Sequence, residues 1–548
     1  MKSTAVRGAD ALLDALKVAD SQTIFTLSGN HVMSVFDAAI DNGVELIHVR
    51  QEGAAVHMAD AWARMTGKVG VVLVTGGPGH ANAISALYTA KCGEMPVVLL
   101  SGHAPLRELG LGAFQEMRQA EMAGPVTKAS WTAQSTATLP QDLARAFRIA
   151  QSGRPGPVHL SLPSDVLEAE FSGVCPAASD FAAETQPLAL PAARAIVREI
   201  AEAKRPLVVA SPLLATPPGR KVVAGLQQAL GVPVVVMESP RGVNDPGLGA
   251  IADILAECDL IVLLGKALDF TLRFGKAPAM AAECRWIVID PDVELLARAA
   301  RTEKERLSIT AVADARSAAN ALMKAAAEGG AGNHRQWAAE VQAAIDYRPW
   351  PVDVAAYPRN GGIHSTAMCL ALQPFFDHHA DSIFVCDGGE IGQWAQAVLK
   401  APQRIINGFA GAIGSSIPFA IGAGKACPGS PVLTVVGDGT FGFHMAEFDT
   451  AVRNRLPFVA VVGNDAKWNA EYQIQVRDFG EPRAKGCTLA QATRYDLVAS
   501  ALGGHGEFVE RVEDLPGAME RAFASGRPAC VNVLIQGTPA PIVRRKKK

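Results

Sequence analysis

Short apolar runs alternate with stretches of helical periodicity along most of this chain. In the first third, the pattern predicts buried parallel strands at Gly70–Thr75, Pro96–Ser101 and Pro157–Leu162. Helical stretches such as Ala54–Thr66 and Ala81–Ala90 precede the first and second of these strands. The alternation predicts an α/β protein built from doubly wound parallel sheets. The middle third repeats it, with strands expected at Pro206–Ala210, Val232–Met237, Leu260–Leu264 and Trp286–Asp290.

Two changes in composition divide the 548 residues into three segments. Residues 172–192 and 326–360 are rich in small residues and Pro and have little periodicity, so we expect linkers there. Each remaining segment has its own α/β alternation and predicts one doubly wound domain. The expected units are an N-terminal domain over 1–175, a central domain over 190–335, a C-terminal domain over 350–538 and a basic tail over 539–548.

The composition excludes several classes of protein. The net charge is −3 and no half of the chain is strongly basic, so nucleic acid and anionic membranes are not expected partners. No apolar run reaches the roughly 18 residues that a membrane span needs, and no secretory signal is apparent. Nine cysteines lie scattered between Cys92 and Cys530, which favours reduced thiols. We therefore expect a soluble, cytoplasmic protein.

The chain ends in five basic residues, for which two roles stay open. They can form a solvated tail, or they can form a flap that pairs with phosphates of a ligand such as coenzyme A. The residues are Arg544, Arg545, Lys546, Lys547 and Lys548.

The clearest chemical motif begins at Pro431, with the sequence PVLTVVGDGTFGFHMAEFDTAVRNRLPFVAVVGNDAKWN. The carboxyl ends of neighbouring parallel strands meet at one edge of a sheet, so Asp438 and Asp465 can converge there. Two carboxylates, a carbonyl and diphosphate oxygens form a suitable shell for Mg²⁺. The expected elements are a strand at Val432–Val436, a tight turn at 437–439, a helix at about His444–Arg455 and a strand at Phe458–Val462.

This motif resembles that of thiamine diphosphate enzymes, in which GDG is followed by NN after a fixed interval. The resemblance implies that Asp438 and Asp465 bind Mg²⁺ through side chains and Lys467 through its carbonyl. Asp465 replaces the second Asn of the family and keeps an oxygen ligand. The implied contacts to the diphosphate are Gly437, Gly439 and Thr440.

The N-terminal segment contributes a second group of residues. Glu52 follows a predicted strand and opens a helix, where either the helix dipole or catalysis can favour an acidic residue. The pattern Arg50-x-Glu52-x-x-Ala55 resembles acetolactate synthase-like enzymes, in which this Glu shares a proton with the cofactor's aminopyrimidine. Further turns resemble cofactor contacts of the same superfamily at Gly79, Asn82, Gly389, Glu390, Ile391, Gly411 and Ile413.

The residues expected around the substrate resemble different members of the superfamily. Asn30 and His31 resemble benzaldehyde lyase, whose His is an acid/base, although His31 can also be structural. Phe114 and Gln115 lie in a G-A-F-Q-E sequence found in acetolactate synthase and in 2-hydroxyacyl-CoA lyase. Trp468 and Glu471 follow the metal motif, where family members place substrate-facing residues, and Trp468 can equally be part of the core.

The resemblance implies a thiamine diphosphate- and Mg²⁺-dependent lyase or carboligase acting on 2-hydroxy ketones or 2-keto acids. The alternative is a 2-hydroxyacyl-CoA lyase or oxalyl-CoA decarboxylase-like enzyme that binds a coenzyme A thioester. An inactive cofactor-binding subunit is a third possibility, which the retained Glu52 disfavours. FAD is not expected, because no Gly-rich turn follows the first strand of the central segment. Family members share their active sites between subunits, so we expect a homodimer or homotetramer. The sequence leaves the substrate open.

Overall fold

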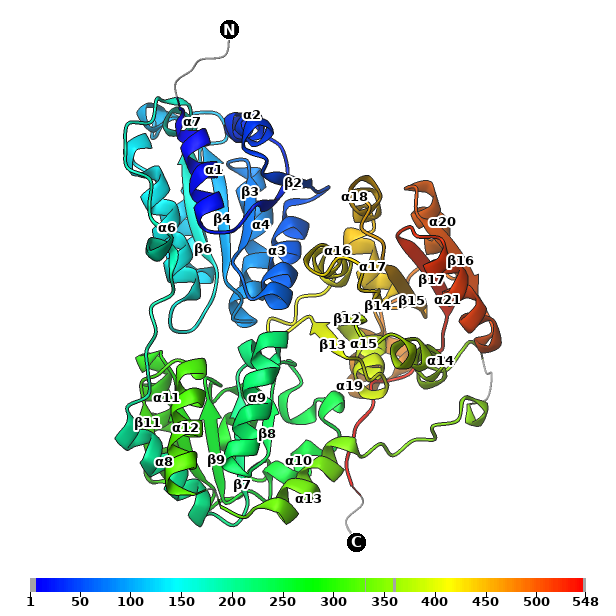
Figure 1. Cartoon of the computed structure of the whole chain (residues 1–548). Helices are drawn as coiled ribbons and strands as arrows, with labels where there is room; N and C mark the ends of the chain where they lie inside the picture. Colours follow the sequence, from blue (N-terminus) through cyan, green and yellow to red (C-terminus); the bar gives the residue numbers. More distant parts are fainter. Residues whose placement is uncertain (1–5, 331, 358–360, 546–548) are drawn as a thin grey trace.

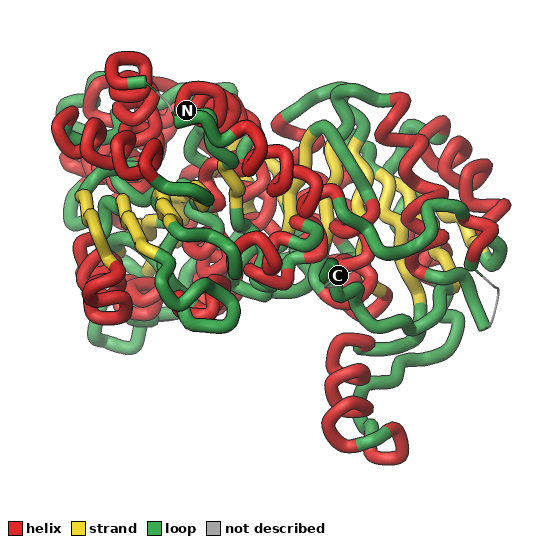
Figure 2. Tube along the Cα trace, turned by 90° about the horizontal axis from the view of Figure 1, so that it is seen from below, coloured by secondary structure: helices red, strands yellow, loops and turns green. Residues whose placement is uncertain are grey.

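The computed structural model of the chain describes residues 6–330, 332–357 and 361–545. It contains three parallel sheets, one in each predicted segment, which confirms the expected fold class. Figure 1 shows the three units as separate blocks in sequence order. In Figure 2 the strands lie between helices, as in doubly wound folds.

The N-terminal sheet has the strand order β2-β1-β3-β4-β6-β5. Its strands are β1 (Thr23–Thr26), β2 (Glu45–His48), β3 (Gly70–Val74), β4 (Val97–His103), β5 (Ser130–Thr132) and β6 (Val158–Pro163). The accompanying helices are α1 (Gly8–Val18), α2 (Met33–Asn42), α3 (Glu52–Thr66), α4 (Pro78–Cys92), α5 (Gln119–Ala123), α6 (Leu139–Gln151) and α7 (Ser164–Glu168).

The central sheet has the order β11-β10-β9-β7-β8. Its strands are β7 (Pro206–Ala210), β8 (Val234–Val236), β9 (Leu260–Leu264), β10 (Arg285–Ile289) and β11 (Leu307–Ala311). Its helices are α8 (Leu190–Glu202), α9 (Pro217–Leu230), α10 (Ile251–Leu255), α11 (Val293–Glu303), α12 (Ala315–Gly329) and α13 (Arg335–Asp346).

The C-terminal sheet has the order β13-β12-β14-β15-β17-β16. Its strands are β12 (Ile383–Cys386), β13 (Gln403–Ile406), β14 (Val432–Gly437), β15 (Val459–Asn464), β16 (His505–Val509) and β17 (Ala529–Leu534). Its helices are α14 (Ser365–His378), α15 (Gly389–Val398), α16 (Ser416–Ala426), α17 (Asp438–His444), α18 (Glu447–Asn454), α19 (Asn469–Phe479), α20 (Tyr495–Ala501) and α21 (Leu515–Ala524).

The first and third sheets share one topology, because their strand orders match when β1–β6 are paired with β12–β17. The turn after β3 in the N-terminal domain therefore corresponds to the turn after β14 in the C-terminal domain. Both turns lie at the carboxyl edge of their sheet, which is where ligands of open α/β sheets bind.

Helices α3 and α16 join the N-terminal and C-terminal domains through a shared apolar core. Small residues allow the two helices to approach closely. At Gly422 of α16, a Cβ atom would lie only 2.4 Å from the Met58 carbonyl of α3. Figure 1 shows α16 beside α3, between the two sheets. The orientation of the N-terminal domain relative to the C-terminal domain is thus set by close backbone packing.

Two sequence-based expectations need correction. The GDG segment opens a helix directly, because α17 begins at Asp438 and a short break separates it from α18. The predicted linker over 326–360 contains α13, whose Trp337, Val341 and Ala344 recur at helical spacing and pack on the central domain. Its Ala- and Gly-rich surroundings hide this periodicity. Residues 331 and 358–360 of that linker lie outside the described residues.

The described part of the basic tail contacts the central domain. Arg544 donates to the Asn244 side chain (3.0 Å), and the Arg545 backbone donates to Asp253 (2.9 Å). Asp253 lies on α10, so acidic residues of the central domain hold the two arginines. Lys546, Lys547 and Lys548 lie outside the described residues.

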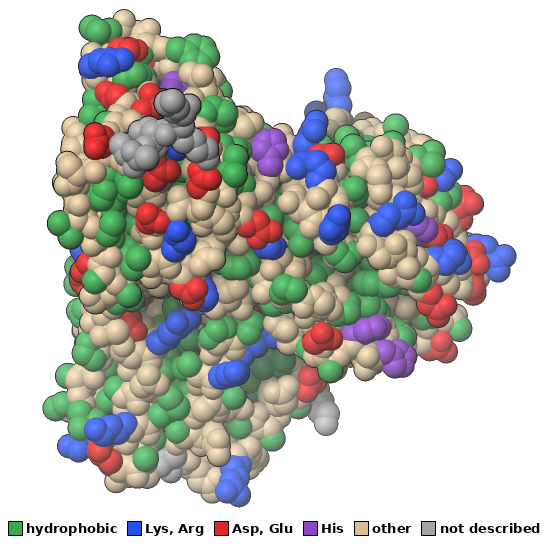
Figure 3. Space-filling model, turned by 45° about the horizontal axis from the view of Figure 1, so that its top comes forward, with side chains coloured by type: hydrophobic (Ala, Val, Ile, Leu, Met, Phe, Trp, Pro, Cys, Tyr) green, Lys and Arg blue, Asp and Glu red, His purple; other side chains and the backbone are tan. Residues whose placement is uncertain are grey.

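The surface carries charges of both signs. Figure 3 shows acidic and basic side chains interspersed over the face in view. None of the described helices is long and apolar enough to cross a membrane.

Candidate active site

The two acidic residues of the metal motif lie at one sheet edge, as their strand positions predict. β14 and β15 are parallel neighbours with Gly437 opposite Gly463, Asp438 begins the helix after β14, and Asp465 follows β15. The glycine at 439 is required by packing, because a Cβ there would lie 2.7 Å from the Trp468 ring.

The electrostatics of this edge fit a cation. Burial and the neighbouring Asp465 raise the pKa of Asp438 to about 7, and burial raises the pKa of Asp465 to about 6. Asp438 Oδ2 is buried without a hydrogen-bond partner. Two converging buried carboxylates are costly unless a cation neutralises them. No cluster of three or more His, Cys, Asp or Glu suited to a metal occurs among the described residues, so a metal here needs oxygens from a backbone carbonyl and a ligand.

A pocket surrounds these carboxylates. Lys467 donates its backbone N–H to Asp465 (3.1 Å), while its ammonium lies over the Tyr472 ring. Because its N–H and its ammonium are both engaged, the carbonyl oxygen of Lys467 is the candidate ligand for a metal ion. Gly411 does not line the pocket. The lining residues are Gly388, Gly389, Glu390, Ile391, Ile413, Gly437, Asp438, Gly439, Thr440, Gly463, Asp465, Lys467, Trp468, Asn469, Ala470 and Glu471.

Asp387 organises this pocket and was missed from the sequence. Its buried carboxylate accepts hydrogen bonds from the backbone N–H groups of Gly388, Gly414 and Ser416. It thereby joins the turn before α15 to the loop that contains Ile413. An Asp-Gly-Gly sequence directly after β12 is the signal that could have identified it.

The N-terminal domain gathers a second group of predicted residues around Glu52. Glu52 is the first residue of α3 and only 7% exposed. The Asn82 amide of α4 donates to Glu52 Oε2 (3.0 Å). At Gly79, a Cβ would lie 3.3 Å from Glu52 Oε1 and 2.8 Å from Thr75 Cγ2. The turn that opens α4 therefore has room for a ligand only because Gly79 lacks a side chain.

His31 lies beside the same turn. It follows Asn30 in a 3-10 helix before α2, and its Nδ1 is 3.3 Å from the Thr75 hydroxyl. Its ring stacks on Phe114 at 6.0 Å between centroids, and Phe114 is 68% exposed. Burial lowers the pKa of His31, which keeps the imidazole neutral near pH 7. Gln115 has a φ of 56° and a buried Oε1 without a partner, so it too is available to a ligand.

The two groups do not meet within one chain. All described residues that line the pocket around Asp438 belong to the C-terminal domain. Glu52, Asn82 and Gly79 lie together in the N-terminal domain, and His31 lies beside them through its contact with Thr75. Each chain thus carries two separate groups of candidate site residues, called half-sites below, at the carboxyl edges of two sheets.

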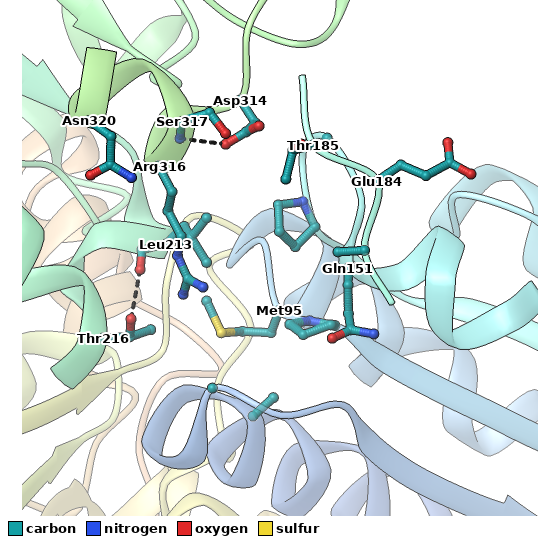
Figure 4. A pocket seen from close by; sticks show the side chains of 16 residues that line it. Met95, Gln151, Glu184, Thr185, Leu213, Thr216, Asp314, Arg316, Ser317 and Asn320 are labelled. Carbon is teal, nitrogen blue, oxygen red and sulfur yellow. Dashed lines mark hydrogen bonds between the residues drawn. The ribbon is translucent and has the colours of Figure 1, made fainter. Parts of the chain in front are cut away.

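Another cavity, of about 300 Å³, lies between the N-terminal and central domains. Figure 4 shows Met95 and Leu213 on its apolar side and Arg316 with Ser317 at the start of α12. The Asp314 carboxylate beside it accepts from the Ser317 and Gln186 backbones. None of the predicted catalytic or cofactor residues lines this cavity, so it is separate from the two half-sites.

Comparison with known proteins identifies the family. The family model of the thiamine pyrophosphate enzyme N-terminal binding domain matches residues 6–122, and the C-terminal binding domain matches residues 387–533. Thiamine pyrophosphate is another name for thiamine diphosphate. Both half-sites lie within these matched ranges.

Whole-chain relatives agree with the domain matches. A probable acetolactate synthase from Mycobacterium bovis is 30% identical over 531 residues, covering 95% of this chain and 94% of that protein. The 2-hydroxyacyl-CoA lyase 2 of Homo sapiens is 29% identical over 590 residues, covering 98% and 91%. The acetolactate synthase large subunit of Parasynechococcus marenigrum is 27% identical over 556 residues, covering 97% and 88%. This chain therefore belongs to the thiamine pyrophosphate enzyme family, as a thiamine diphosphate-dependent enzyme of the lyase and carboligase type.

Proposed function

We propose that the C-terminal pocket holds the cofactor's diphosphate through Mg²⁺, bound by Asp438, Asp465 and the Lys467 carbonyl. The supporting observation is the pair of buried carboxylates at one sheet edge, one of which has an oxygen without a hydrogen-bond partner, because such a pair is costly unless a cation neutralises it. Mg²⁺ prefers an octahedral shell of oxygens, which these three residues would share with diphosphate oxygens. Gly439 and Thr440 line the remaining wall.

We propose that Glu52 is the proton-transferring residue at the aminopyrimidine. When bound, thiamine diphosphate supplies a nucleophilic carbon that also accepts electrons from the bond being broken. Glu52 is mostly buried, receives one hydrogen bond from Asn82, and borders the space left by Gly79. This placement leaves Oε1 free to hold or release a proton at a ligand in that space.

We propose that the active centre forms between two copies of the chain. The support is the separation of the half-sites, because residues of the N-terminal domain are missing from the described lining of the Asp438 pocket. A second copy would bring its Glu52 half-site to this pocket and receive the reciprocal contact, which is the geometry of a two-fold symmetric dimer. The active unit would then be a homodimer or a dimer of such dimers.

For the reaction, we propose cleavage or ligation of carbon–carbon bonds in 2-hydroxy ketones or 2-keto acids. A neutral His31 next to the exposed Phe114 can take a proton from a substrate hydroxyl and return one to a new alkoxide. Gln115 offers an unpaired amide oxygen beside it. Trp468 and Glu471 lie on the wall of the opposite half-site, where they would border the same substrate.

A coenzyme A thioester is the second candidate substrate, supported by similarity to 2-hydroxyacyl-CoA lyase 2. Lys266 of the central domain is buried and donates to Asp269 (2.9 Å). Arg544 and Arg545 donate hydrogen bonds to side chains of the central domain. Arg316 is exposed and lines the cavity between the N-terminal and central domains, so it is a candidate contact for a phosphate.

The test is a product screen of the purified chain with thiamine diphosphate and Mg²⁺. Pyruvate, benzoin, acetoin, oxalyl-CoA and a 2-hydroxyacyl-CoA would each be supplied, and products would be identified by mass spectrometry. Turnover of a keto acid or hydroxy ketone by the wild type, absent in Glu52→Ala, supports the first candidate. Turnover of the thioesters alone supports the second, and turnover of none contradicts both.

A further inference from the structure

A carboxylate from the C-terminal domain holds the backbone just before Glu52. Glu447, the first residue of α18, is 1% exposed. The Arg50 backbone N–H donates to both of its oxygens (3.0 and 3.2 Å), and the Thr450 hydroxyl donates to Oε2 (2.6 Å). Arg50 is two residues before Glu52. Glu447 therefore fixes the segment from which α3 and its catalytic Glu begin.

Neighbouring contacts reinforce this attachment. Arg453 of α18 donates to the His48 carbonyl at the end of β2 (2.8 Å). The Arg50 guanidinium lies 3.6 Å from Asp449, also on α18. One helix of the C-terminal domain thus contacts the backbone at the end of β2, and both the backbone and the side chain of Arg50 within the β2–α3 connection. The connection cannot shift without breaking contacts to α18.

The same part of the C-terminal domain contains the metal motif. α17 begins at Asp438 and ends at His444, three residues before Glu447. The His444 ring packs edge-on against His57 of α3, with centroids 5.9 Å apart. A continuous set of contacts therefore connects Asp438 to Glu52 in one chain, through α17, α18 and the start of α3.

We propose that Glu447 is a positioning residue for Glu52, and that through it the diphosphate half-site of one active centre is connected to the proton-transferring Glu of the other. This inference rests on the proposed shared site. In such a dimer, Asp438 of a chain acts in one centre while Glu52 of the same chain acts in the second. The contacts around Glu447 connect the two within one chain.

Loss of Glu447 should act on proton transfer more than on cofactor binding. Without its carboxylate, the Arg50 N–H and the buried Thr450 hydroxyl lose their partner, and the first turn of α3 can shift. A misplacement of about 1 Å costs on the order of 10²-fold in rate for a catalytic group. Glu447→Ala should therefore slow hydrogen exchange at C2 of bound thiamine diphosphate by about 10²-fold. Glu447→Gln keeps one oxygen for Arg50 and should restore most of the exchange.

Hybrid dimers separate this role from a local effect on the metal site. One chain would carry Asp438→Ala, the other Glu52→Gln, and two affinity tags would isolate the hybrid. If sites are shared, one centre combines both lesions and the second is intact, so C2 exchange should persist at about half the wild-type amplitude. A hybrid without exchange would overturn the shared site, and with it the inference.

Glu447→Ala is then added to one chain at a time. On the Asp438→Ala chain, it removes support from the Glu52 that serves the intact centre, so exchange should fall by about 10²-fold. On the Glu52→Gln chain, Glu447→Ala affects only a position where the catalytic Glu has already been replaced. Exchange should therefore stay at the rate of the hybrid without Glu447→Ala. The reverse pattern, or equal loss from both placements, would refute the positioning role. Both hybrids contain the same substitution once, so general destabilisation would affect them equally.

Discussion

Two buried histidines should make this fold sensitive to acid. His80 and His159 have no exposed surface, and their ring centroids are 4.5 Å apart. His80 Nδ1 lies 2.9 Å from the Ser101 hydroxyl, and its Nε2 has no partner. His80 stands between Gly79 and Asn82 on α4, so a charge on its ring would disturb the turn that borders Glu52.

The size of the stability loss in acid follows from the lowered pKa of His80. Burial lowers the pKa of His80 from 6.5 to about 4. The unfolded chain therefore binds a proton at higher pH than the folded chain does. The contribution of neutral His80 to the free energy of unfolding is fully present above pH 6.5 and is lost as the pH falls toward 4. The loss is about 2 kcal/mol at pH 5 and about 3 kcal/mol at pH 4. Burial also lowers the pKa of His159, which adds to the loss.

The assay is urea unfolding of wild type and His80→Asn at pH 7.5, 6 and 5, followed by circular dichroism. Asn cannot be charged and can still meet Ser101, so the variant should lose about 2 kcal/mol less than wild type between pH 7.5 and 5. His378→Asn, at an exposed helix end, is the matched control and should follow wild type. Parallel losses in wild type and His80→Asn would refute the linkage.

Four further outcomes are expected. Glu52→Ala should keep its fold and bind Mg²⁺, yet exchange the cofactor C2 proton about 10²–10⁴-fold more slowly, which NMR after acid quench would measure; wild-type exchange would contradict the assignment. In calorimetry, Asp438→Ala should no longer bind thiamine diphosphate in the presence of Mg²⁺, whereas Asp465→Asn should still bind it because Asn keeps an oxygen ligand. Loss of binding in Asp465→Asn would place the second metal ligand elsewhere. The purified protein should show no flavin absorbance near about 450 nm, and a yellow protein would contradict the interpretation of the central domain. His31→Ala should slow cleavage or ligation at least about 10²-fold while C2 exchange stays near normal, and unchanged turnover would transfer the acid/base role to another group such as Gln115.

The sequence alone predicted the three sheets and placed several candidate site residues in the turns directly after their strands. Buried strands such as Gly70–Val74 are continuous apolar runs, which only the interior of a parallel sheet accommodates. Turn chemistry directly after such strands located Asp438, Asp465 and Gly79, since adjacent parallel strands carry their ends to a common edge. Helix α13 was not predicted from the sequence. Its few large apolar residues lie in and beside a stretch rich in Ala and Gly, where apolar and polar positions differ too little for a helical period to be recognised.

Only the tertiary structure decided which of these groups meet. Glu447 and Arg50 are 397 residues apart, and their contact depends on how closely α3 packs on α16. The pairing of His80 with His159 and the attachment of Gly414 to Asp387 likewise join separate strands and loops. Such contacts have no local signature, because each depends on the packing of whole elements and not on the period or turn chemistry of one segment. The family resemblance already implies active sites shared between subunits, and the placement of the two sheets leaves N-terminal residues out of the described lining of the Asp438 pocket.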